Sequence, residues 1–302
     1  MQPMIISPTL GSTTNYFHLE DSGDAFILAK IAQQTKPIVI ITSSALAAQR
    51  LREEIPFFLP EMKIHLLPDW ETLPYDTFSP HHDLTSERLA TLYQVMCDVC
   101  DVLIVPVTTA IYRMPPREYL AAHTFFLKRG EKIMLESLRS QMSLGGYTHV
   151  TQVISPGEYS VRGGLIDLFP MGSALPYRID RINDEIESIR TFDVDTQRSI
   201  YPVDEIRLLP AREFPFSKDG RDRFRRNFRE KFEGDPSRSS IYKDIGKGIA
   251  SAGIEYYFPL FFDQTATLFD YLPDATLLCL HHDINSEIES FWRDTQSRYK
   301  LL

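Results

Sequence analysis

In the first third of the chain, short and almost uniformly apolar runs alternate with segments whose apolar residues recur at helical spacing. The apolar runs lie at residues 37–42, 63–67 and 102–107, and the helical segments lie at 21–35, 45–55 and 85–97. Uniformly apolar runs of this length are typical of strands that are buried on both faces of a parallel sheet. Because helix and strand alternate, the pattern predicts a doubly wound α/β domain over residues 1–121.

The middle of the chain has a different pattern, in which short runs alternate between apolar and polar residues and are separated by turn signals. These runs lie at residues 158–161, 164–169, 177–182 and 186–192, and the turns lie at 162–164, 170–173 and 183–184. A period of two predicts a meandering antiparallel sheet. We place it in an α+β domain over residues 122–210, which opens with a strand at 125–127 and a helix at 133–147.

Four arginines stand on the strands of this predicted sheet or at their turns, namely Arg162, Arg178, Arg181 and Arg190. Strands hold their side chains on a rigid scaffold, and a rigid scaffold is where a protein-binding face is best built. The strand surface is therefore the candidate functional surface of the chain.

The last third of the chain, residues 211–302, predicts a smaller third part. Within it Phe224, Phe228 and Phe232 recur every four residues and give one apolar helical stripe, while six basic and two acidic residues share the rest of the segment 221–232. The favoured interpretation is a solvated face on a helix packed against a core, and the alternative is a nucleic-acid or partner contact. A final helix is expected at 284–302. It ends without a capping signal, which suggests a piece of a longer protein.

Composition excludes several classes of protein. The chain has 302 residues and a net charge of −9, from 41 acidic and 32 basic side chains, which argues against a strong autonomous binder of duplex DNA. No apolar run reaches transmembrane length and the amino terminus lacks the features of a signal peptide, so we expect a cytoplasmic protein without membrane contact. Its 43% hydrophobic residues are enough for packed cores.

Metal and redox chemistry are not favoured by the cysteine pattern. Cys97 and Cys100 form a C-x-x-C pair, but the one other cysteine is Cys279, beside His281 and His282, and the pair ends a helical segment instead of starting one. We therefore expect reduced, partly buried thiols and no metal. The proline-rich loop at 67–83 is interpreted as an ordered segment whose aromatic residues pack, with nucleic-acid stacking as the alternative, and 81–83 as solvated loop.

The turn that enters the first helix is the place where an α/β domain of this kind would hold a phosphate. Its residues are Ser22, Gly23, Asp24 and Ala25, with Asp21 and Ser22 able to cap the helix. A Walker A loop needs a lysine on the phosphates and a hydroxyl on magnesium. Asp24 places a negative charge there and Ala25 cannot ligate a metal, so the loop is a degenerate nucleotide loop and no catalytic residue is assigned.

Several long blocks resemble the amino-terminal part of bacterial transcription-repair coupling factors. They are LPDWETLPYD at 67–76, RGGLIDLFPMG at 162–172, FDVDTQRS at 192–199 and LLPA at 208–211, and the resemblance runs over nearly all of the chain. The patterns V-R-G-x-x-I-x-x-F-P and D-E-I-x-x-I-x-x-F-D are also similar to the front of the excision-repair protein UvrB.

The resemblance implies a UvrB-like module of three parts: a RecA- or helicase-like α/β domain, an inserted α+β domain that binds the repair protein UvrA, and a small third subdomain packing on the first. It implies a non-catalytic, monomeric adaptor that needs no cofactor. Full-length members of the family are implied to be ATP- and Mg²⁺-dependent DNA translocases that displace RNA polymerase, through polymerase-binding and double-stranded-DNA-binding domains beyond residue 302. The alternative is an active UvrB-like, nucleotide-dependent DNA-binding or helicase domain.

Carried over position by position, the resemblance implies that Arg162 and Arg178 contact UvrA. The family usually places two aromatic residues after the block that contains Arg178, and here these positions hold Arg181 and Ile182. Isoleucine still buries apolar area but lacks the flat ring that commonly anchors an interface. The expected UvrA-binding residues are therefore Arg162, Arg178, Arg181 and Ile182.

Overall fold

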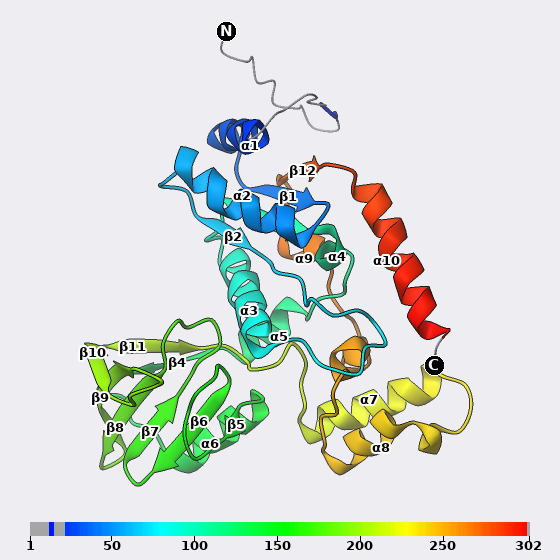
Figure 1. The fold of residues 1–302 in the computed structure, drawn as a ribbon. Helices are drawn as coiled ribbons and strands as arrows, with labels where there is room; N and C mark the ends of the chain where they lie inside the picture. The colour runs from blue at the N-terminus through cyan, green and yellow to red at the C-terminus, as the bar shows by residue number, and fades with distance from the viewer. Residues whose placement is uncertain (1–11, 15–21, 301–302) are drawn as a thin grey trace. The chain divides into compact units, whose positions relative to one another are not determined.

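The structure is a computed structural model that describes residues 12–14 and 22–300. The chain forms two compact units (Figure 1). The first unit combines the described residues up to Asp69 with Thr91–Tyr112 and with the described residues from Thr267 onward. The second unit combines Trp70–Ala90 with Arg113–Ala266. None of the helices in the described part of the chain is long and apolar enough to span a bilayer.

The first unit is built on a sheet of four parallel strands in the order β12-β1-β3-β2. The strands are β1 (Ile38–Thr42), β2 (Ile64–Leu66), β3 (Val102–Pro106) and β12 (Leu277–His281). Every residue of the central strands β1 and β3 is buried. Helices cover a sheet of this kind on both faces, so its central strands need apolar side chains in both directions. The predicted parallel α/β sheet is thus confirmed.

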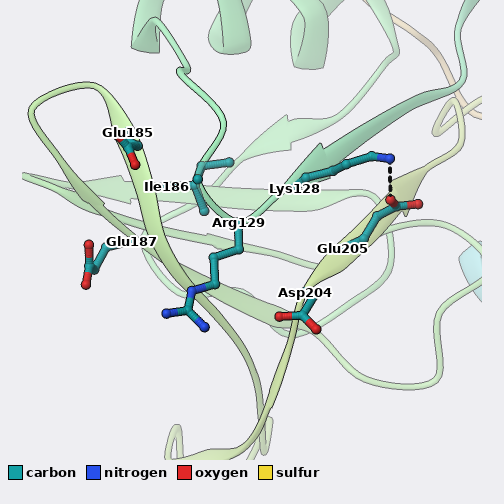
Figure 2. Close-up of a pocket in the computed structure, with 8 residues that line it drawn as sticks. Lys128, Arg129, Glu185, Ile186, Glu187, Asp204 and Glu205 are labelled. Carbon is teal, nitrogen blue, oxygen red and sulfur yellow. Dashed lines mark ion pairs between the residues drawn. The ribbon is translucent and has the colours of Figure 1, made fainter.

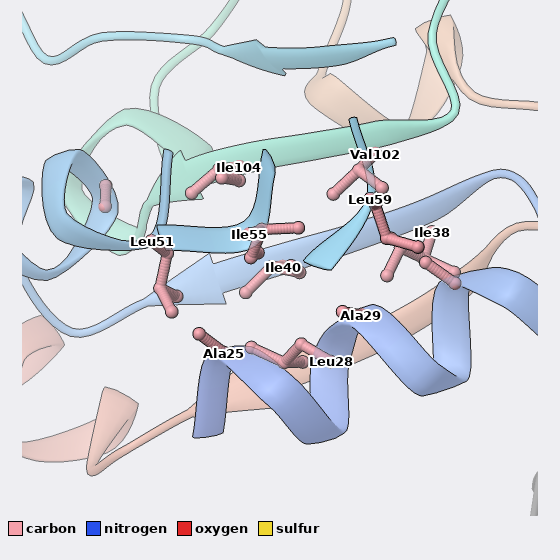
Figure 3. Packing of buried hydrophobic residues seen from close by; sticks show 12 residues of the cluster. Ala25, Leu28, Ala29, Ile38, Ile40, Leu51, Ile55, Leu59, Val102 and Ile104 are labelled. Atoms are coloured by element: carbon pink, nitrogen blue, oxygen red, sulfur yellow. The ribbon is translucent and has the colours of Figure 1, made fainter. Parts of the chain in front are cut away.

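Helices α1 (Gly23–Gln34) and α2 (Ala45–Phe58) pack on one face of this sheet. Figure 3 shows the resulting core, in which Leu28 of α1 and Leu51 of α2 lie against Ile40 of β1. The Ser44 side chain caps α2 by accepting a hydrogen bond of 3.1 Å from the Ala47 N–H. The strand order reverses after β2, and right-handed crossovers therefore place the part of α3 (His82–Met96) that belongs to this unit, from Thr91 onward, on the opposite face from α2. The remaining helices of the unit are α4 (Val107–Ala110), α9 (Leu268–Tyr271) and α10 (Ile284–Tyr299).

Strand β12 comes from the end of the chain and completes the first sheet. It pairs in parallel with β1, with Ile40 opposite Cys279. From the sequence we expect this segment in a third part at 211–302, and the boundaries of the three parts stay a prediction. The expected helix at 284–302 is confirmed as α10 up to Tyr299, while residues 301 and 302 lie outside the described residues.

The second unit contains a sheet of six strands in the order β10-β9-β8-β7-β6-β5. The strands are β5 (Thr148–His149), β6 (Glu158–Arg162), β7 (Leu165–Leu168), β8 (Tyr177–Ile182), β9 (Glu185–Phe192) and β10 (Ser199–Val203). All neighbours from β6 to β10 are antiparallel, and β5 is parallel to β6. The predicted antiparallel meander is confirmed. Beside it, β4 (Phe125–Lys128) pairs with β11 (Glu205–Leu208).

Helices make up the rest of the second unit. They are α5 (Arg117–Ala122), α6 (Leu135–Leu144), α7 (Lys218–Lys231), α8 (Ser240–Lys247) and two 3₁₀ segments at Pro236–Arg238 and Ile254–Phe261. The predicted phenylalanine stripe of α7 is confirmed for Phe224 and Phe228, which are buried, but Phe232 is 46% exposed. Arg223 and Arg226 of the same helix pair with Asp263, as a solvated charged face does.

A buried ion pair holds the loop after β2 inside the second unit. Arg88 of α3 is 0% exposed, and its Nε donates a hydrogen bond of 2.6 Å to Glu213. The Trp70 ring lies under the Arg88 guanidinium, and its Nε1–H donates to the same carboxylate. Packing of the loop aromatics is therefore confirmed for Trp70, whereas Tyr75 and Phe78 are exposed.

Candidate protein-interaction face

The strand register of the six-stranded sheet separates a charged face from an apolar face. Asp167 of β7 lies directly opposite Arg178 of β8, and Arg178 lies opposite Arg190 of β9. Opposed residues share a face, and the residues before and after them point to the other side. Ile166 and Ile179 belong to that other side and are fully buried. The charged face is the one available to a partner.

Asp167 is the shared acceptor of two arginines on the charged face. Its carboxylate accepts hydrogen bonds from Nε and Nη2 of Arg178, at 2.7 and 2.9 Å, and one of 2.6 Å from Nη2 of Arg162. The Asp167 side chain is 1% exposed. Charge-assisted bonds of this geometry fix the direction of both guanidinium groups. The sheet therefore presents Arg162 and Arg178 as one ordered pair.

Arg178 is held from three sides. Besides its two bonds to Asp167, its Nη1 donates a hydrogen bond of 2.9 Å to the Gln197 carbonyl, and its guanidinium lies 4.8 Å from the centre of the Phe192 ring. The hydrogen bond with Asp167 raises the pKa of Arg178 above its usual value. With 15% of its side chain exposed, Arg178 offers little surface to a partner.

Arg162 and Ile182 are the exposed members of the face. The Arg162 side chain is 54% exposed and Ile182 is 58% exposed. Both stand beside two-residue hairpin turns, and the turn after β6 requires glycine, because a Cβ on Gly164 would lie 2.7 Å from the Arg181 carbonyl. The predicted turn at Asn183 and Asp184 is confirmed, since both residues adopt positive φ as a type I′ hairpin demands.

Arg181 points away from the other three expected residues. Along β8 the side chains alternate, so Arg178, Asp180 and Ile182 share the charged face and Arg181 lies on the opposite one. There its Nη1 donates a hydrogen bond of 2.6 Å to Asp184. The structure thus brings Arg162, Arg178 and Ile182 to one face but does not bring Arg181 to it.

Two further polar pairs belong to the face and were not singled out from the sequence. Arg190 bonds to Asp180 on the neighbouring strand, and the Ser188 hydroxyl donates to the same carboxylate at 2.8 Å. Arg190 was noted as a strand arginine, but Asp167 and Asp180 were missed. A carboxylate inside the apolar strand 165–168 is itself a sequence signal, because a buried charge needs a partner.

A groove of about 530 Å³ lies near the Ile182 end of the sheet. Figure 2 shows it with Glu185 and Glu187 from β9, Asp204 and Glu205 on the other side, and Lys128 paired to Glu205 at 2.7 Å. Acidic side chains outnumber basic ones, four to two. None of the expected UvrA-binding residues lines this groove. Glu185 of the groove nevertheless lies directly opposite Ile182, so the acidic groove adjoins this end of the face.

The degenerate nucleotide loop lies in the first unit, where α1 begins at Gly23 after Ser22. The Ser22 side chain makes no capping hydrogen bond, and Asp21 lies outside the described residues. The Asp24 carboxylate accepts a hydrogen bond of 2.7 Å from the Ala25 N–H, so it occupies a backbone donor that a phosphate would use. Arg50 of α2 and His281 of β12 also bond to Asp24.

These contacts change the protonation of the loop. Burial raises the pKa of Asp24, but hydrogen bonds from Arg50, His281 and the Ala25 N–H outweigh burial and lower the pKa to about 2. Burial lowers the pKa of His281, against the opposing effect of its bond to Asp24. At neutral pH the loop therefore presents a carboxylate, which repels a phosphate.

The remaining candidate residues are spread over the chain. Cys97 lies just after α3 and Cys100 just before β3, so the C-x-x-C pair does end a helix as expected. Cys100 is partly buried as expected, but the expectation is wrong for Cys97, which is exposed. His82 and Asp83, interpreted above as solvated loop, instead form the first turn of α3, and both are exposed. Helix α3 starts three residues earlier than predicted, with Asp83 adding a favourable negative charge at its amino end.

Comparison with known proteins finds a matching family model and several relatives. Residues 125–214, which include the whole six-stranded sheet, match the family model described as the UvrB interaction domain. Over 278 residues, or 91% of this chain, it is 46% identical to the transcription-repair-coupling factor of Escherichia coli, and over 284 residues it is 43% identical to that of Haemophilus influenzae. The chain is homologous to the transcription-repair-coupling factors.

A further relative matches the chain at lower identity. The transcription-repair-coupling factor of Bacillus subtilis is 27% identical over 277 residues. The chain spans about a quarter of the length of the curated relatives it matches, since it covers 24% of the Escherichia coli, Haemophilus influenzae and Bacillus subtilis proteins. The comparisons therefore describe one region of a larger type of protein.

Proposed function

We propose that this chain is a non-catalytic adaptor region of a transcription-coupled repair protein and that it recruits UvrA through the charged face of its six-stranded sheet. The observation that carries the proposal is the Asp167-centred pair of Arg162 and Arg178, on a domain that matches the UvrB interaction domain. Oriented guanidinium groups suit a partner that offers carboxylates. Ile182, exposed on the same face, supplies apolar area for the centre of the contact.

The partner surface follows from the chemistry of the face. Arg162 keeps most of its hydrogen-bond donors free of Asp167, because only its Nη2 bonds to that carboxylate. An acidic side chain on UvrA that meets Arg162 would share the guanidinium with Asp167. Arg178 contributes mainly by holding the shape and charge of the face, and Arg181 lies on the opposite side of the strand.

The degenerate loop supports the non-catalytic part of the proposal. Asp24 fills the helix amino terminus with the protein's own carboxylate. An ATP-dependent translocase activity, displacement of RNA polymerase and binding of duplex DNA are proposed for the whole type of protein and for regions other than this chain. We likewise propose that this chain is located in the bacterial cytoplasm.

A binding titration with purified UvrA from the same organism tests the proposal. Arg162→Glu should weaken binding by about tenfold or more, because it removes one charge-assisted contact and adds a repulsive one. Arg139→Glu is the matched control, since Arg139 lies on α6 and is similarly exposed. Equal binding by both variants and the wild type would rule out the charged face as the contact.

A further inference from the structure

Two consecutive histidines, His281 and His282, lie at the end of β12 near the first turn of α1. His281 is the last residue of β12, and its Nε2 lies 2.7 Å from the Asp24 carboxylate. His282 follows with a φ of +65°, which breaks the alternation of a strand and leaves the two imidazole centres 4.0 Å apart. Asp24, His281 and His282 each offer one ligand atom, and these atoms lie within 4.8 Å of one another.

His281 has an unsatisfied nitrogen inside the protein. The residue is 7% exposed, and its Nδ1 has no hydrogen-bond partner among the described residues. Buried polar atoms are paired in the large majority of cases, so an unpaired imidazole nitrogen calls for an explanation. Nδ1 is therefore free to carry the ring hydrogen when Nε2, the nitrogen that faces Asp24, binds a ligand.

The local charge favours a cation. Arg50 bonds to Asp24 and also donates a hydrogen bond of 2.7 Å to Glu54. The carboxylates of Asp24 and Glu54 both contact the Arg50 guanidinium. These three groups together carry a net charge of −1 when the imidazoles are neutral. Arg50 thus competes for Asp24 without making the cluster positive.

We propose that Asp24, His281 and His282 form a binding site for a borderline divalent cation of the Zn²⁺ type. Two imidazoles and one carboxylate are a ligand set that Zn²⁺ accepts, with water in the fourth position on the side of the exposed His282. Neighbouring ligand atoms stand roughly 3.3 Å apart around tetrahedral Zn²⁺. The cation takes the place of the proton between His281 Nε2 and Asp24, and this proton moves to Nδ1 of the same ring, so His281 stays neutral.

This site lies in the first unit, on the strand that the end of the chain contributes, and it is independent of the face proposed for UvrA. It also uses residues of the degenerate nucleotide loop. The position that holds a phosphate-binding lysine in an active loop holds a carboxylate here, and the strand beside it supplies histidines. Where an active loop binds an anion, this loop and the neighbouring strand would bind a cation.

Calorimetric titration of the whole, chelator-treated chain with ZnCl₂, followed by CoCl₂ with visible absorption, tests the site. His282→Gly removes the exposed ring and suits the positive φ, so the variant should fold. We expect saturable binding of one equivalent by the wild type and a loss of affinity of about tenfold or more in His282→Gly. We also expect Zn²⁺ to raise the melting temperature of the wild type but not of the variant.

Two controls make the result specific. His82→Ala removes another exposed histidine, and a double Cys97→Ser, Cys100→Ser variant removes the C-x-x-C pair; both should bind Zn²⁺ as the wild type does. The Co²⁺ complex should lack the intense near-ultraviolet band of thiolate ligation. No saturable binding, unchanged binding in His282→Gly, or loss of binding in the double cysteine variant would each overturn the proposal.

Discussion

The carboxylate of Asp167 accepts two hydrogen bonds from Arg178 on the neighbouring strand, almost completely out of solvent. The same carboxylate reaches Arg162 at the edge of the face. Arg178 is consequently part of the domain's internal structure as much as of its surface. The family resemblance treats Arg162 and Arg178 alike, but in the folded protein Arg162 is exposed and Arg178 is largely buried.

Removing the charge of Asp167 should destabilise the domain. Asp167→Asn leaves the Arg178 guanidinium partly buried without its carboxylate, which costs about 3 kcal/mol of unfolding free energy. Urea denaturation followed by circular dichroism measures this loss. Asp180→Asn is the matched control, because Asp180 is 32% exposed and its pair with Arg190 contributes about 1 kcal/mol or less. Equal stabilities of the two variants would contradict the account of Asp167.

The buried pair of Arg88 and Glu213 gives a second stability prediction. Glu213→Gln strips a fully buried guanidinium of its counter-ion, and the expected cost is about 3–5 kcal/mol. Unfolding in urea, followed by the fluorescence of Trp70, reports on the same cluster, and Trp292→Phe in the background removes the other tryptophan. Glu205→Gln, from the exposed pair with Lys128, should change stability little. A stable Glu213→Gln variant would show that the pair is not important for the fold.

The three cysteines should differ in their reaction with iodoacetamide. Burial raises the pKa of Cys100 to about 12 and that of Cys279 to about 11, whereas Cys97 is exposed. At pH 8 roughly one Cys100 thiol in ten thousand is ionised, and the thiolate is the nucleophile. Mass spectrometry of the native protein should find Cys97 modified first. Labelling of Cys279 should rise as the pH approaches 11, and uniform labelling at pH 8 would contradict these burial effects.

Ile182 offers a gain-of-function prediction. The family resemblance places an aromatic residue at this exposed position, and a flat ring buries more area at low entropic cost. Ile182→Phe should therefore strengthen UvrA binding by a few-fold, while Ile182→Asp should weaken it by about tenfold or more. Surface plasmon resonance with immobilised UvrA measures both changes. Unaltered affinity in both variants would exclude Ile182 from the contact.

The sequence predicted those elements whose partners are neighbours along the chain. Alternation of apolar and polar residues located strands β6 to β9, because each strand has one buried face and its neighbours follow at once along the chain. The same alternation should have separated Arg181 from Arg178 and Ile182, since residues an odd number of positions apart lie on opposite faces. Whether Arg181 contacts UvrA from that opposite face stays a prediction.

Long-range partners could not be read from the sequence. The pairing of β12 with β1 joins segments more than 230 residues apart, and an apolar run at 275–280 fits a strand in any sheet. Asp24 was expected to repel a phosphate, but its bonds to Arg50 and His281 depend on that pairing. The Arg88–Glu213 pair likewise spans two segments that are joined only in the fold.

The most direct measurement for the proposed function is a calorimetric titration of UvrA into the whole chain, its Arg162→Glu variant and its Arg139→Glu control. Circular dichroism should first show that all three proteins are folded alike, because Arg162 is exposed and its removal leaves Asp167 bound to Arg178. The account predicts binding by the wild type and by Arg139→Glu, with the affinity of Arg162→Glu reduced about tenfold or more. Binding of equal strength by all three proteins, or no binding by the wild type, would contradict it.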